Sequence, residues 1–90
     1  MTIVLDGALM TERAAAHEYL AKKLNFPGYY GKNLDALYDL LTENSRPLCL
    51  VLYRTNVMRE ALTGYADSLI NVLKEAAADN TCIEVYEDGV

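Results

Sequence analysis

The sequence predicts an α/β fold in which helices pack against a small three-stranded parallel sheet. Three short runs, at 2–6, 48–53 and 82–87, have the length and the apolar, β-branched composition of strands. A pair of helical patterns separates each run from the next, and connections of that length join parallel strands rather than antiparallel ones. The 90 residues suffice for one hydrophobic core, so we expect a single domain, 1–90.

The first strand and the first helix follow from residue types and turn signals. The run 2–6 is rich in β-branched and apolar residues and ends at an Asp-Gly turn. Good helix formers fill Ala14–Leu24, with Thr11 as the expected N-cap and an end near Asn25.

The second half of the chain supplies two more strands and two more helices. Leu48–Tyr53 is an almost continuous apolar run, which favours a middle strand that is buried on both faces. A short helix over 56–63, closed by Gly64, and a long helix with Asn80 as its C-cap follow. The alternating run Cys82–Glu87 predicts a last strand with one wetter face. The long helix is predicted from apolar residues at helical spacing: Ala66, Leu69, Ile70, Leu73 and Ala77.

The net charge of −5 is unevenly distributed along the chain. Residues 46–59 carry +3, whereas residues 60–90 sum to −6, with seven acids against Lys74 alone. A negative field repels phosphate backbones and attracts basic surfaces. We therefore expect no direct binding to nucleic acid, and a basic protein as the partner.

Two features bear on location. No apolar run is long enough to span a membrane, and the opening residues lack the basic start of a signal peptide. Cys49 and Cys82 lie far apart in strand-like runs, as reduced core cysteines do. These features predict a cytoplasmic protein that does not associate with membranes.

The stretch 25–41 combines a turn with the start of a helix. Its proline and glycines interrupt the chain, after which Asn33 is the expected N-cap of a helix running to about Glu43. Asp35 falls in the first turn, where the helix dipole favours a carboxylate. At about 100° per residue, Asp35, Asp39 and Glu43 lie within roughly 80° of one another, away from the apolar stripe.

The acids of this helix admit three interpretations. Asp35 and Asp39 could bind a divalent cation or act as an acid–base pair, although a hard-metal site needs about six oxygen ligands. A solvated helix face is the common explanation of such spacing. The repulsion between like charges, beside displayed aromatic residues, favours instead a surface for a binding partner. No cofactor is expected.

Other candidate residues fit roles in packing or on the surface. Of Tyr29 and Tyr30, one is expected inside and one outside, because adjacent side chains in a glycine-flanked loop point in different directions. His17 is expected to pack or to lie at the solvent edge, since no Ser-His-Asp or Cys-His arrangement can be assembled around it. Glu75 and Asp79 repeat the acidic spacing on the long helix. With no phosphate loop and no metal-ligand spacing, the chain is not expected to be an enzyme.

One gap-free motif lies in this stretch: Pro27-x-Tyr29-Tyr30-Gly31-x-Asn33-Leu34-Asp35-Ala36-Leu37-x-Asp39. It resembles the signature of the barstar family, the intracellular inhibitors of barnase-type ribonucleases. The resemblance extends over nearly the whole chain and implies the same three-stranded parallel fold. It also implies an immunity protein of a toxin–antitoxin pair, which plugs the active site of a basic microbial ribonuclease with the acidic helix and the Tyr-Tyr-Gly loop.

The resemblance implies a role for each matching residue. Asp39 would occupy the pocket meant for substrate phosphate, Asp35 would pair with a cation at the rim, and Tyr29 would pack on an active-site imidazole. The partner-binding set that it implies is Tyr29, Gly31, Asn33, Asp35, Tyr38, Asp39 and Glu75.

Four departures from the family pattern bear on the choice of partner. Tyr38 replaces a tryptophan, Leu40 replaces a cysteine, and Lys32 replaces an acid. The loop 42–47 is slightly shorter and lacks an aromatic residue. A second function therefore stays open, that of an immunity or regulatory protein for another basic toxin or nuclease. A small divalent-metal enzyme that uses the helix aspartates is a further alternative.

Overall fold

The computed structural model describes residues 1–88, and the order of elements is the predicted one: strand, two helices, strand, two helices, strand. The strands are β1 (Thr2–Asp6), β2 (Leu48–Tyr53) and β3 (Ile83–Glu87). The helices are α1 (Arg13–Leu24), α2 (Leu34–Thr42), α3 (Thr55–Leu62) and α4 (Gly64–Asp79), and a 3₁₀ turn, Gly7–Leu9, follows β1. Within the described residues, none of these helices has the length and apolar character needed to cross a membrane.

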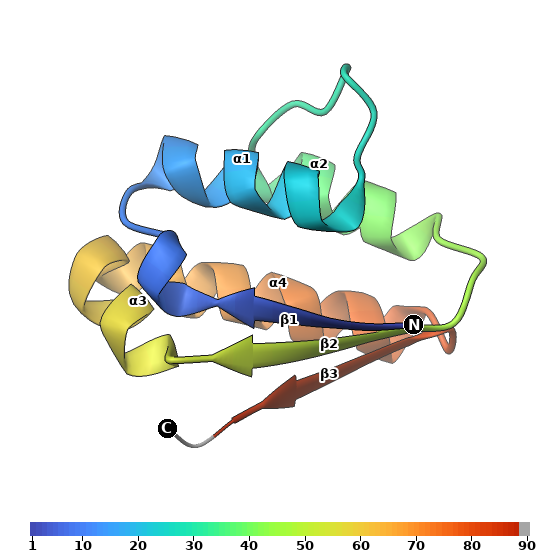
Figure 1. Cartoon of the computed structure of the whole chain (residues 1–90). Helices are drawn as coiled ribbons and strands as arrows, with labels where there is room; N and C mark the ends of the chain where they lie inside the picture. The colour runs from blue at the N-terminus through green and yellow to red at the C-terminus, as the bar shows by residue number, and fades with distance from the viewer. Residues whose placement is uncertain (89–90) are drawn as a thin grey trace.

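β2 is the central strand of a parallel sheet ordered β1-β2-β3, which confirms the predicted fold class. Residues at the same register point to the same face, so Val4, Val51 and Tyr86 form one row across the three strands. Figure 1 shows α4 lying behind the strands, while no helix of the described chain crosses the side of the sheet that faces the viewer. The fold therefore has two layers.

One face of the sheet is buried and the other is open. Leu5, Leu50 and Leu52 are almost completely buried on the face that packs against the helices. Val4 and Tyr86 on the opposite face keep 48% and 55% of their surface exposed. The prediction that the middle strand is buried on both faces is therefore wrong, because helices cover only one face of the sheet.

Two helix boundaries differ from the sequence prediction. α1 begins after Glu12, which is extended and makes no side-chain cap, so Thr11 is not the N-cap. Gly64 opens α4 instead of closing α3, and the break lies at Thr63, whose φ of 53° is in the left-handed region. Glycine is the usual residue in that region, so residue preference alone cannot place such a break at a threonine.

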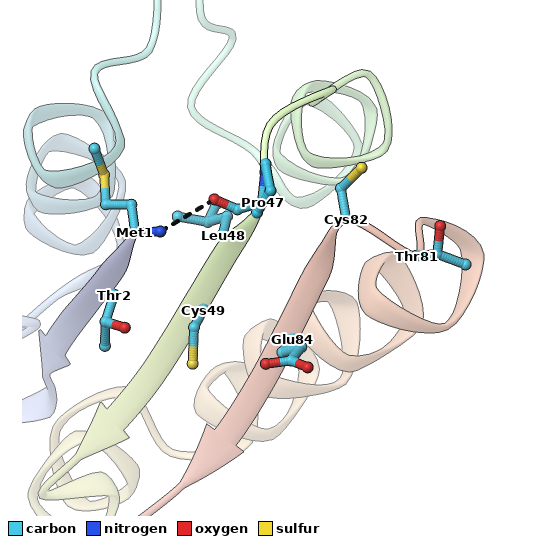
Figure 2. A pocket seen from close by; sticks show the side chains of 8 residues that line it. All are labelled: Met1, Thr2, Pro47, Leu48, Cys49, Thr81, Cys82 and Glu84. Carbon is cyan, nitrogen blue, oxygen red and sulfur yellow. Dashed lines mark hydrogen bonds between the residues drawn. The ribbon is translucent and has the colours of Figure 1, made fainter.

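Cys49 and Cys82 are free thiols, as predicted. The prediction that they belong to the core is wrong, because both are only half-buried. Cys49 lies opposite Glu84, which follows Cys82 by two residues, and Figure 2 shows the two cysteine side chains pointing in different directions. Together with Met1 and other residues they line a hollow of about 380 Å³ at the edge where the strands begin. The two thiols are not arranged as a disulfide pair.

Candidate functional site

The loop 25–33 joins α1 to α2 and holds its two adjacent tyrosines in opposite environments. Asn25 ends α1 with a left-handed φ of 54°, and the amide of Tyr30 donates to the carbonyl of Pro27 at 3.0 Å. Tyr30 is buried, with 6% of its surface exposed, whereas Tyr29 is 80% exposed. The prediction of one tyrosine inside and one outside is confirmed.

Asn33 fixes the end of this loop and the start of α2. Its side-chain oxygen accepts a hydrogen bond from the Ala36 amide at 2.8 Å, which is the N-cap predicted from the sequence. Its side-chain nitrogen donates to the carbonyl of Gly31 at 3.2 Å. A methyl group on Gly31 would lie 3.3 Å from the side chains of both Asn33 and Ala36, so the close contact favours glycine. Loop and helix are thus held as one unit.

α2 presents two different faces. Leu37 and Leu41 are buried in the core, where the helix packs on α4. Asp35, Asp39 and Glu43 are exposed on the other side, as the helical spacing predicts. Like charges at this spacing weaken a free helix by about 0.2–0.5 kcal/mol per pair, so the packing of the apolar face must hold the acids in place.

Tyr38 links the acids of α2 with those of α4. Its hydroxyl donates a hydrogen bond to the carboxylate of Asp79. This hydrogen bond is the main cause that raises the pKa of Tyr38, followed by desolvation and by the negative charges of Asp79, Glu75 and Asp39. Three carboxylates from two helices therefore lie within electrostatic reach of one phenol. The structure brings Glu75 and Asp79 beside Asp39. The sequence could not establish this proximity, because the residues belong to different helices.

Asn80 holds the far end of α2. Its side-chain nitrogen donates to the carbonyls of Leu41, Thr42 and Asn44 at 3.0, 3.3 and 2.7 Å. The end of a helix leaves such carbonyls without intrahelical partners. Asn80 is also the C-cap of α4, as predicted, but no sequence pattern indicated its contacts with α2.

Lys32 lies between Gly31 and Asn33, two residues of the implied binding set. Its φ is 53°, and its ammonium nitrogen lies 3.8 Å from a carboxylate oxygen of Glu18 on α1. The basic residue of this loop is thus paired with an acid of α1 and, within the described chain, forms no ion pair with the carboxylates of α2.

A buried cluster beneath the loop was missed at the sequence level. His17 is 1% exposed, and its Nδ1 and Nε2 atoms lie 2.6 Å from the hydroxyls of Tyr30 and Tyr65 respectively. Burial lowers the pKa of His17 and raises that of Tyr30, so both groups are neutral near pH 7. The packing role predicted for His17 is confirmed, and the solvent-edge alternative is wrong. The cluster connects the loop to α1 and α4.

The carboxylates around α2 offer few of the ligands that a metal ion needs. Over residues 1–88, no group of three or more His, Cys, Asp or Glu side chains is arranged to hold a metal ion. Asp35 and Asp39 could supply only part of the roughly six oxygen ligands that a hard cation takes. The geometry favours a solvated or partner-binding face over the metal-enzyme alternative.

Two comparisons with known proteins bear on the family. Residues 1–86 match the family model described as Barstar (barnase inhibitor). Over 75 residues the chain is 43% identical to the protein YrdF of Bacillus subtilis (strain 168), whose name describes it as a candidate ribonuclease inhibitor. That match covers 82% of this chain and 82% of the relative.

Proposed function

The chain belongs to the barstar family, and from this premise we propose that it inhibits a basic microbial ribonuclease by plugging its active site. The plug is α2 with the loop before it. The inhibitor performs no chemistry, because it excludes RNA by occupying the site. The proposal includes an immunity role inside the cell that makes the ribonuclease.

The acidic surface behind this proposal consists of five exposed side chains on two helices: Asp35, Asp39, Glu43, Glu75 and Asp79. A ribonuclease cleft is positively charged because it binds the phosphates of RNA. Carboxylates on a fixed helix can take the places of those phosphates and accept charge-assisted hydrogen bonds from Arg and His. The acidic field also accelerates association with a basic partner.

We place Asp39 at the centre of the proposed contact with the ribonuclease. It lies on α2 one turn after Asp35 and next to Tyr38. Asp39 enters the phosphate pocket, Asp35 pairs with a cation at its rim, and Tyr29 packs on an active-site imidazole. Further contacts come from the loop and the two helices: Gly31, Asn33, Tyr38 and Glu75.

The single observation that carries the proposal is the exposure of Tyr29, 80% of its surface, on a loop that is otherwise fixed. The neighbouring Tyr30 is buried and hydrogen-bonded to His17, and Asn33 caps the helix that follows. Rigid elements lose little conformational entropy on binding, and exposed aromatic residues beside charged groups are typical anchors of interfaces. An exposed aromatic side chain on a fixed loop is therefore better suited to a partner than to water.

Titration calorimetry against a set of barnase-type ribonucleases tests the proposal. We expect nanomolar or tighter binding that Asp39→Ala weakens by about 30-fold to several thousand-fold. That is the range for truncating one side of a buried charge pair, the barnase–barstar complex among the known cases. Added salt should also weaken binding, because it screens the surface charges. The control is Glu60→Ala, which removes one negative charge at an exposed site on α3 and should change the affinity by less than about threefold.

Salt-insensitive binding, or equal losses for Asp39→Ala and Glu60→Ala, would contradict the proposal. A competition assay distinguishes this proposal from the second function, that of an immunity or regulatory protein for another basic toxin. A ribonuclease inhibitor protects RNA from digestion, whereas an inhibitor of a different nuclease protects DNA and leaves RNA digestion unchanged.

A further inference from the structure

A hollow of about 550 Å³ lies between α1 and the start of α2, beside the acidic surface. Its lining includes Arg13, Lys32, Leu34, Asp35 and Tyr65. Asp35 belongs to both the hollow and the acidic surface. A protein that covers the acidic surface along α2 therefore meets the hollow as well.

The hollow differs from the acidic surface because two cations line it. Arg13 and Lys32 are both exposed, and Asp35 is the one acid among the lining residues. His17 also lines the hollow, but both of its ring nitrogens face tyrosine hydroxyls and its burial keeps it neutral. The hollow thus offers two solvent-exposed cations beside the carboxylate of Asp35.

Lys32 is an unusual residue for its backbone conformation. Its φ of 53° lies in the region that glycine adopts readily and that residues with a Cβ atom avoid. Residues held in such conformations are found preferentially at functional sites. Its position between Gly31 and Asn33 places a positive side chain in the middle of the proposed contact loop.

Both cations are available to a partner. Lys32 and Glu18 are 3.8 Å apart, and more than half of each side chain is exposed. Exposed ion pairs of this kind are weak, so a carboxylate from another protein can replace Glu18. The guanidinium of Arg13 lies over the ring of Tyr65, 4.3 Å from its centroid. Stacking on a ring leaves the N–H donors at the edge of the guanidinium free for a carboxylate.

We propose that the ribonuclease recognised by this chain presents an aspartate or glutamate side chain that enters the hollow and pairs with Lys32 and Arg13. This inference rests on the proposed function, because it concerns the same contact. It makes Lys32 a specificity-determining residue. A target with an acid at this place is favoured, and a target with a basic residue there is repelled.

Inhibition constants for barnase and a panel of other barnase-type ribonucleases test this pairing. The ribonuclease that the natural chain binds most tightly should lose at least about tenfold in affinity with Lys32→Glu. The control is Lys23→Glu, which changes the net charge equally at an exposed site of α1 outside the hollow. It should alter the constant by less than about threefold.

The variant Lys32→Gly distinguishes an effect on ribonuclease binding from an effect on folding stability. Glycine accepts a φ of 53° without strain, so this variant should unfold at the same or a higher urea concentration while it binds the ribonuclease more weakly. In the ribonuclease, changing the facing acid to its amide should abolish the difference between the natural chain and Lys32→Glu.

The outcomes distinguish this inference from the function on which it rests. Inhibition that is equal or stronger with Lys32→Glu would overturn the inference and leave the proposed function standing. If neither the natural chain nor Lys32→Glu inhibits any ribonuclease of the panel, the proposed function is overturned and the inference with it.

Discussion

Replacing His17 with glutamine should remove most of the pH dependence of folding stability between about pH 7.5 and 5. In the natural chain both ring nitrogens of His17 lie 2.6 Å from tyrosine hydroxyls, and the side chain is 1% exposed. A neutral imidazole suits this site, since one nitrogen can donate to a hydroxyl while the other accepts. Burial disfavours the charged form and holds the pKa of His17 below its ordinary value.

The sign and size of the effect follow from proton binding in the folded and unfolded chains. The unfolded chain takes up a proton near pH 6.5 and the folded chain only at lower pH, so stability is lost as the pH falls below 6.5. The free energy of unfolding falls by about 1.4 kcal/mol per pH unit until the pH reaches the pKa of His17 in the folded chain. At pH 5 the loss is therefore at most about 2 kcal/mol, a large fraction of the roughly 5 kcal/mol expected for a small domain.

Urea unfolding followed by far-ultraviolet circular dichroism across this pH range gives the slope for each chain. His17→Gln should be less stable than the natural chain at neutral pH, because a buried side chain is replaced, but it should lose little more on acidification. Asp6 does not add to the pH dependence of stability in this range. Its hydrogen bond with Arg54 lowers its pKa from 3.8, so its contribution to folding stability is lost only below that pH. Equal slopes for the two chains, or a flat profile for the natural chain, would refute the reasoning.

Two further substitutions test the contacts that support the fold. Asn80→Ala removes the donor to three carbonyls at the end of α2 and should lower the free energy of unfolding by about 1–3 kcal/mol in urea titrations. Gly7→Ala would place a methyl carbon 2.4 Å from the carbonyl oxygen of Arg54, which should cost about 1–3 kcal/mol. Gly28→Ala, whose methyl group meets no atom within 4 Å, is its matched control, and equal thermal midpoints for the two glycine variants would contradict the packing argument.

Local chemistry explains why the order of elements could be predicted. The N-cap at Asn33 needs only the amide of Ala36, three residues further on, and the two faces of α2 follow from the spacing of its own residues. The open face of the sheet could not be predicted in the same way. A continuous apolar run such as Leu48–Tyr53 has the same pattern whether helices cover one face or both.

The contacts that sequence patterns did not reveal join residues that are far apart in the chain. His17, Tyr30 and Tyr65 come from α1, the loop and α4, and no spacing rule relates them. The same holds for the hydrogen bond between Tyr38 and Asp79, which brings the acids of α4 beside those of α2. The candidate binding residues were therefore visible in the sequence, whereas the residues that position them were not.

The residues proposed for binding differ in their energetics from the residues that hold them. Asp35 and Asp39 repel each other on α2, and Lys32 has a conformation that glycine would adopt more easily. The supporting contacts lie elsewhere, with Asn33 and Asn80 at the two ends of the helix. A short helix carrying like charges frays readily when it is free. Because α2 is fixed at both ends, its carboxylates keep their spacing before any partner arrives, and little conformational entropy is left to lose on binding.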